Sequence, residues 1–235
     1  MNLQKQNKYS TEPESYKKHR YRKIDDERKQ STDRQKRISI NLDSDEEYET
    51  RRKVPGEHLY SDKVSGLKTT MVFSTSITKG INVQDFNDAY VNGRAEFHRF
   101  RGKKAPHIKN YIKSHLSVEK PDRVLIHVGG NDLPPGPNQR PMPVDELAHH
   151  IIEAGEISER FGVKEIYVAG VTARPGLQDR CYKLNDRLKE LCRERKYVYI
   201  NNDNISLTHL YDKVHIGKPG SKILMENYLH ALNSN

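Results

Sequence analysis

The chain has 235 residues, of which 34% are hydrophobic and 31% charged, and an excess of basic residues gives a formal net charge of +9. This composition is too polar for even packing along the whole chain, so part of the chain is expected to be disordered. The polar start is not typical of a secretory signal, and no apolar run approaches the roughly 18 residues of a membrane helix. We therefore expect a protein that spans no membrane, is not secreted and works in the cytoplasm or nucleus.

The two cysteines also favour a reducing compartment. Cys181 and Cys192 lie eleven residues apart in one predicted helix, so at about 1.5 Å per residue they are roughly 16 Å from each other. This separation is too large for a disulfide. Both residues fall on the apolar side of the helix, where we expect buried, unreactive thiols.

Residues 1–66 are expected to form a disordered, charged tail, because they show almost no apolar periodicity. A dense basic cluster precedes an acidic segment at residues 43–49. The cluster contains Lys17, Lys18, Arg20, Arg22 and Lys23. The tail can be a solvated linker, or it can be a nuclear-import or nucleic-acid-binding arm that neutralises phosphates while nearby tyrosines stack on bases.

Residues 67–235 alternate short apolar strands with amphipathic helices and predict a folded domain. Strands are expected at 69–73, 95–100, 124–128, 165–169 and 197–200. Helices are expected at 105–116, at 144–161, along the cysteine-bearing stretch and at 221–232. This alternation indicates an α/β fold, a three-layer α/β/α sandwich around a five-stranded parallel sheet with right-handed crossovers.

Small polar residues follow the first and the central strand of this predicted sheet. The central strand is followed by Gly129, Gly130, Asn131 and Asp132, and the first strand by the hydroxyl cluster at 74–76. In a flavodoxin-like sheet of order 2-1-3-4-5, both segments flank the topological switch point, where such folds bind ligands. Each segment also has a purely structural interpretation. Residues 129–132 can form an Asx turn, and the hydroxyl cluster at 74–76 can cap a helix.

A candidate acid–base pair lies near the C-terminus. Asp212 and His215 are three residues apart in a predicted loop, a spacing at which a carboxylate can orient an imidazole. A serine hydroxyl, an amide donor, a backbone N–H near Gly102 and an oriented histidine are the components of acyl transfer.

Residues 69–232 resemble the SGNH (GDSL-type) hydrolase family, whose four blocks carry serine, glycine, asparagine and histidine in that order. The blocks match here at Ser76, at Gly102, at residues 129–132 and at residues 212–215. The resemblance implies a serine esterase or acyl hydrolase on a flavodoxin-like α/β/α sandwich, with no metal or organic cofactor.

The resemblance also implies a role for each matching residue. Ser76 would be the nucleophile, His215 its general base and Asp212 the carboxylate that orients the histidine. The oxyanion hole would consist of the backbone N–H groups of Ser76 and Gly102 and the side chain of Asn131.

The block around the nucleophile departs from the family. Its motif is Gly-Asp-Ser, whereas this chain reads Ser74-Thr75-Ser76. Ser74 adds bulk where glycine allows tight packing, and Thr75 removes a carboxylate that helps to hold the turn. The alternative is therefore a catalytically impaired domain that acts as a binding module, with the basic tail directed to nucleic acid or a protein partner. This combination also resembles esterase-bearing proteins encoded by mobile elements, including non-LTR retrotransposons.

Other polar residues of the domain have simpler interpretations. His127 lies inside the central strand and is expected to be a packed, hydrogen-bonded residue. Asp212 and His215 alone are too few to form a zinc site. Four cations are expected either to surround the pocket mouth and favour an anionic substrate, or to be ordinary solvated surface. These are Arg140, Arg174, Lys213 and Lys218.

Overall fold

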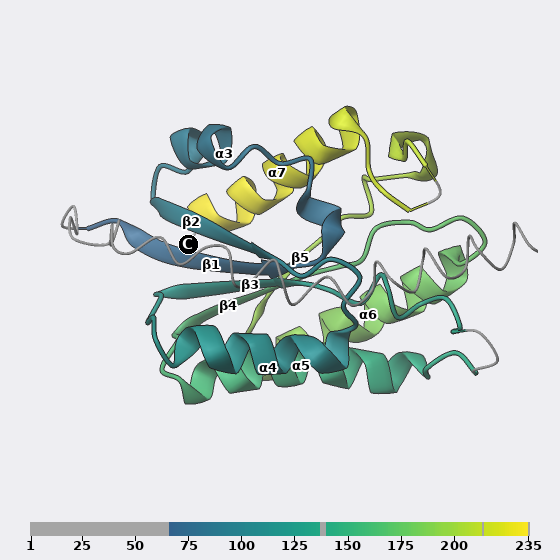
Figure 1. The fold of residues 1–235 in the computed structure, drawn as a ribbon, viewed down its shortest axis with the longest axis horizontal. Helices are drawn as coiled ribbons and strands as arrows, with labels where there is room; N and C mark the ends of the chain where they lie inside the picture. The colour runs from purple at the N-terminus through teal and green to yellow at the C-terminus, as the bar shows by residue number, and fades with distance from the viewer. Residues whose placement is uncertain (1–65, 137–139, 213, 235) are drawn as a thin grey trace, which may run out of the picture. The chain divides into compact units, whose positions relative to one another are not determined.

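A computed structural model describes residues 66–136, 140–212 and 214–234 of the chain (Figure 1). The predicted tail, apart from Gly66, lies outside these residues, and so does Lys213. In the part of the chain that is described, no helix is long and apolar enough to cross a membrane.

The core of the structure is a five-stranded sheet whose strands are all parallel. The strands are β1 (Lys68–Ser74), β2 (Gly93–Arg99), β3 (Arg123–His127), β4 (Glu165–Ala169) and β5 (Val198–Ile200). Their order is β2-β1-β3-β4-β5, which confirms the predicted topology. All five residues of β3 are buried, as expected for a central strand that is covered on both faces.

Helices cover both faces of the sheet and complete the predicted α/β/α sandwich (Figure 1). One face carries α4 (Ala105–Leu116), α5 (Val144–Arg160) and α6 (Gln178–Arg195), and the other carries α3 (Val83–Ala89) and α7 (Lys218–Asn233). Successive residues of β3 pack alternately against the helices on the two faces of the sheet. Val124 and Ile126 pack in the cluster with α4, α5 and α6, whereas Leu125 packs in the cluster with α3 and α7.

The helices of the first layer follow the sequence closely. Ile108, Ile112 and Leu116 of α4 are buried at the four-residue spacing that was used to predict it. Gly162, with φ +90°, follows the end of α5 in the left-handed conformation typical of a C-terminal glycine. Cys181 and Cys192 of α6 are buried and free.

Two helices differ from the prediction for local reasons. Helix α3 was not predicted, because it is seven residues long and Phe86 is its one buried residue, so it has no apolar repeat. The side chain of Asn82 accepts a hydrogen bond from the Gln84 N–H and starts the helix. Helix α7 begins at Lys218, three residues before its predicted start, because Pro219 fits the first turn of a helix.

A buried arginine connects the elements at the amino-terminal edge of the sheet. Arg123, the first residue of β3, is fully buried. Its Nε lies 2.7 Å from Glu165 Oε2, and its Nη1 donates to Tyr90 Oη and to the Leu232 carbonyl. The guanidinium can be buried there because these acceptors replace its contacts with water.

Candidate active site

The parallel register brings the ends of three strands to one edge of the sheet. Ser74 of β1 pairs with Arg99 of β2 and with His127 of β3. Ser76 and Gly129 therefore each lie two residues beyond a paired position, and the segment that follows β2 starts at the same level. The structure brings the first three predicted blocks to the edge where open α/β sheets bind their ligands.

The segment after β1 forms a closed turn around Ser76. Ser76 is the first residue of a short 3-10 helix, η1 (Ser76–Thr78), and its side chain is partly exposed. The Oγ of buried Ser74 lies 2.7 Å from the Oγ1 of Thr78, and the Ser74 carbonyl accepts from the Phe100 N–H. Ser74 thus holds the turn through its own hydroxyl and carbonyl.

The geometry of η1 leaves the Ser76 N–H available. The first residue of a helical turn has no acceptor for its N–H within that turn. The backbone of Gly102 is also suited to bind an anion, because Gly102 is exposed and adopts φ +69°. In the described residues, no hydrogen bond from the Gly102 N–H is found. Both groups can therefore donate to a ligand.

The loop after β3 places Asn131 beside the loop after β2. Gly129 has φ +103°, and an added Cβ would lie 2.9 Å from Ile151 Cδ1, so this position requires glycine. Asn131 Nδ2 donates to the Lys103 carbonyl at 3.1 Å. A side-chain amide carries two hydrogens, and the second one remains available for an oxyanion.

Asp212 and His215 form a hydrogen-bonded pair in the loop before α7. His215 Nδ1 lies 2.9 Å from Asp212 Oδ2, while Oδ1 accepts from the backbone N–H groups of Val214 and His215. Tyr211 stacks on the imidazole with a centroid distance of 5.8 Å. Hydrogen bonds from His215 and Val214 lower the pKa of Asp212 to about 2, so it is ionised at neutral pH. Because Nδ1 is engaged, Nε2 is the nitrogen that can act as a base.

The turn with Ser76 and the loop with His215 meet through their neighbours. Gly80, just after η1, lies so close to Ser221 at the start of α7 that an added Cβ would overlap its side chain. In the described part of the chain, however, no hydrogen bond joins Ser76 to His215. The two segments are therefore adjacent without a direct hydrogen bond between these two side chains. Such bonds often tighten only when a substrate binds.

His127 is a packed core residue, as predicted. It is 2% exposed, and its Nδ1 forms a hydrogen bond with Tyr228 Oη. Burial, and to a smaller extent the positive charge of Arg174, lower the pKa of His127 to about 3. It is therefore neutral under physiological conditions.

Two residues at this edge have roles that the sequence did not reveal. Asp132 is buried, and its Oδ2 accepts from the Ala105 N–H at the start of α4, which makes it a helix cap supplied from a distant loop. Arg174, expected at a pocket mouth or on solvated surface, is only 7% exposed. Arg140 and Lys218 are exposed. No local sequence pattern predicts the capping contact of Asp132 or the burial of Arg174, since each depends on contact with a different loop.

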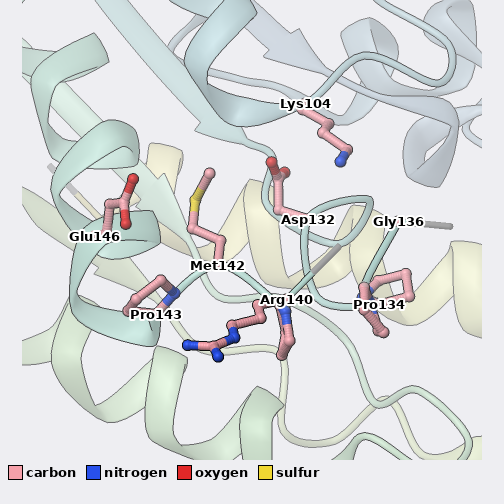
Figure 2. Close-up of a pocket in the computed structure, with 10 residues that line it drawn as sticks. Lys104, Asp132, Pro134, Gly136, Arg140, Met142, Pro143 and Glu146 are labelled. Atoms are coloured by element: carbon pink, nitrogen blue, oxygen red, sulfur yellow. The ribbon is translucent and has the colours of Figure 1, made fainter. Parts of the chain in front are cut away.

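Two cavities lie near this edge, and neither is lined by Ser76, Asp212 or His215. The larger, of about 410 Å³, lies beside Asp132, with Lys104 next to it and Pro143 and Glu146 at the start of α5 on another side (Figure 2). The smaller, of about 290 Å³, is formed by the loops after β4 and β5 together with α6. The candidate centre itself is an open edge flanked by these cavities.

The described residues provide no metal centre. No group of three or more His, Cys, Asp or Glu side chains among them could hold a metal ion.

Comparison with solved structures identifies the fold. A Bacteroides fragilis protein described as an acylhydrolase superposes with a TM-score of 0.61 at 19% identity, covering 74% of this chain and 89% of that one. A GDSL-like lipase from Bacteroides thetaiotaomicron gives 0.60 at 17% identity, with 71% and 88% covered. An acetylxylan esterase from Geobacillus stearothermophilus, solved as a catalytic mutant, gives 0.61 at 15% identity, with 73% and 96% covered.

These likenesses show that the chain has an SGNH-type α/β fold. No protein-family model and no curated protein sequence matches the chain. At such low identity the resemblance establishes the fold, while function has to be argued from the site itself.

Proposed function

We propose that the protein is a serine esterase or acyl hydrolase in which Ser76 is the nucleophile, His215 the general base and Asp212 the residue that orients His215. The observation that carries this proposal is the Asp212–His215 hydrogen bond, at a sheet edge that also presents Ser76 and Asn131. Nucleophile, base and orienting carboxylate are the three parts of a serine hydrolase triad.

In the first half of the reaction, Ser76 Oγ attacks the carbonyl carbon of an ester while His215 Nε2 takes the hydroxyl proton. The negative charge that develops on the carbonyl oxygen is stabilised by the N–H groups of Ser76 and Gly102 and the free amide hydrogen of Asn131. The tetrahedral intermediate collapses, the ester C–O bond breaks, and His215 gives its proton to the departing alcohol.

In the second half, water replaces the alcohol. His215 takes a proton from the water, the resulting hydroxide attacks the acyl–Ser76 ester, and the same oxyanion hole stabilises the second intermediate. Its collapse releases the carboxylic acid and returns the proton to Ser76 Oγ. Asp212 stays ionised throughout, because its pKa of about 2 is far below the working pH.

The test is hydrolysis of short and medium p-nitrophenyl acyl esters by the 235-residue chain. Ser76→Ala and His215→Ala should each reduce kcat by at least roughly 10³-fold, because a triad acts as a unit. Asp212→Asn should reduce kcat by roughly 10²- to 10⁴-fold, because it leaves the imidazole without its orienting charge.

Exposed residues of the same types provide matched controls. Ser114→Ala on α4 and His149→Ala on α5 change exposed side chains that are not among the candidate site residues, and they should leave turnover unchanged. Turnover that is absent from the wild type, or that survives in Ser76→Ala, would contradict the esterase proposal. The alternative, a binding module with a basic tail, would then be the proposal to pursue.

A further inference from the structure

Arg174 is a buried cation that has no hydrogen-bond or ion-pair partner among the described residues. It lies in the loop after β4 and is 7% exposed. In the part of the chain that the structure describes, its guanidinium makes no hydrogen bond and no ion pair, and its Nε is enclosed without an acceptor. Leaving a buried charge without an acceptor is costly. An arginine in this state is expected where a ligand supplies the missing acceptor.

The contrast with the other buried arginine supports this interpretation. Arg123 at the opposite edge of the sheet has Glu165, a tyrosine hydroxyl and a backbone carbonyl as acceptors. The fold therefore satisfies a guanidinium where it serves stability alone. Arg174 has no comparable set of acceptors.

Arg174 lies directly against the proposed oxyanion hole. An added Cβ on Gly130 would be 2.6 Å from Arg174 Nη2 and 3.4 Å from its Cζ, so the guanidinium rests on the backbone immediately before Asn131. Burial lowers the pKa of Arg174, and the nearby Cys181 and, to a smaller extent, the Asp212 carboxylate oppose this effect. The cation thus lies near both Asn131 and the carboxylate that orients His215.

The end of the side chain is accessible to a ligand. Among the nitrogens of Arg174, Nε alone is enclosed, and the two terminal nitrogens, which also lack partners, are not. A planar guanidinium with free terminal N–H groups matches the geometry of a carboxylate or a phosphate.

We infer that Arg174 binds an anionic group of the substrate, a carboxylate or phosphate carried near the ester that Ser76 attacks. This inference rests on the proposed esterase function and defines its substrate class: esters in which either the acyl or the alcohol part is anionic. Arg174 has the role of a specificity residue, and neutral esters do not use it.

The experiment compares anionic and neutral esters of similar size on the 235-residue chain. p-Nitrophenyl hemiglutarate carries a carboxylate on the acyl side and is compared with p-nitrophenyl butyrate. Butyryl glycerol 3-phosphate carries a phosphate on the alcohol side and is compared with monobutyrin. Arg174→Met should lower kcat/KM for at least one anionic ester by roughly 10- to 100-fold and change its neutral counterpart by less than about threefold. The ester that responds identifies which side carries the anion.

Two further variants test whether the preference for anionic esters depends on the guanidinium of Arg174. Arg174→Lys keeps the charge without the planar fork and should retain part of the preference. Arg160→Met removes an exposed cation at the end of α5 that lines neither cavity, and it should leave the ratio of anionic to neutral turnover unchanged. An equal loss for anionic and neutral esters in Arg174→Met, or a wild type that shows no preference for either anionic ester, would overturn the inference.

Direct binding separates this inference from the esterase proposal. Calorimetric titration of glutarate and of glycerol 3-phosphate should show binding to the wild type and to Ser76→Ala, and at least tenfold weaker binding to Arg174→Met. Binding without any ester turnover would support the anion site and contradict the esterase proposal. Ester turnover without binding of either anion, and without a difference between charged and neutral esters, would support the esterase proposal and contradict the anion site.

Discussion

At the scale of single residues, glycine and serine backbones shape the candidate centre. Gly129 allows β3 to turn sharply into the Asn131 loop, and it does so against the side chain of Ile151. The hydroxyl of Ser74 bonds to that of Thr78 and closes the turn that presents Ser76.

Gly129→Ala should lower the free energy of unfolding by about 2 to 4 kcal/mol, since it combines the cost of a left-handed alanine with overpacking against Ile151. Gly162→Ala is the matched control, because its φ is +90° but nothing lies within 4 Å of an added Cβ. That variant should cost about 1 to 2 kcal/mol. Urea unfolding measures both, and equal losses would show that Ile151 simply moves aside.

Asp132 should make stability depend on pH in an unusual direction. Burial raises its pKa above the usual range despite the hydrogen bond from Ala105. The pKa of Asp132 is therefore higher in the folded than in the unfolded protein. Its carboxyl contributes most to the free energy of unfolding below the unfolded pKa, and this contribution is lost as the pH rises through the folded pKa. Asp132→Asn keeps an oxygen acceptor without the charge, so it should gain stability relative to wild type as the pH rises from about 3.9, the ordinary pKa of Asp, through the raised folded pKa.

Urea unfolding of wild type and Asp132→Asn across that range provides the measurement. A stability difference that stays constant with pH, or that favours wild type more as the pH rises, would contradict the prediction. The latter result would mean that the negative charge at the start of α4 outweighs its burial.

At the scale of elements, ion pairs link strands and helices with unequal effect. Arg123 and Glu165 join β3 to β4 at a fully buried guanidinium, whereas Lys109 and Glu153 join α4 to α5 through two partly exposed side chains with a similar 2.7 Å contact. A buried cation cannot be solvated by water when its partner is removed, whereas a surface cation can. The two pairs therefore allow the effect of burial to be measured within one protein.

Glu165→Gln should lower the free energy of unfolding by about 1 to 3 kcal/mol, a range reduced from that of a fully buried pair because the Glu165 side chain is 31% exposed. Glu153→Gln should cost less than about 1 kcal/mol. Denaturant unfolding of Glu165→Gln, Glu153→Gln, Arg123→Met and the double variant Arg123→Met/Glu165→Gln makes the comparison. A double variant as unstable as the sum of its single changes would argue against coupling.

At the scale of the whole molecule, the charge suits the proposed substrate class. Residues 66–235 alone contain 25 Lys and Arg against 19 Asp and Glu, a formal charge of +6. A net positive charge raises the rate at which anionic molecules encounter the protein, and salt screens this effect. The same charge is compatible with the alternative of nucleic-acid binding through the basic tail.

If the tail binds nucleic acid, the affinity of the 235-residue chain for a single-stranded oligonucleotide should fall steeply with salt. Changing the basic cluster to glutamine should reduce the slope of log K against log salt by about 0.7 for each phosphate contact removed. The changed positions are Lys17, Lys18, Arg20, Arg22 and Lys23. Fluorescence anisotropy over a salt series measures the slope, and affinity that does not respond to salt would exclude this role.

Local patterns in the sequence were enough to predict the five parallel strands and the chain positions of the candidate residues. Strands such as 124–128 are apolar because both faces are buried, and the helices of the first layer carry clear four-residue repeats, so local pattern was sufficient. Asp212 and His215 are close in sequence, and their pairing could be anticipated from spacing. Helix α3, with one buried residue, carried too little signal to be predicted.

The contacts between the loops could not be predicted from local sequence patterns. Asn131 is held by the Lys103 carbonyl, Asp132 caps a helix 27 residues away in sequence, and Arg174 is buried against Gly130. Each contact joins loops that follow different strands, and their distance depends on strand order and register. An isolated arginine in a polar loop resembles solvated surface in the sequence, because burial is a property of what the rest of the chain packs around it.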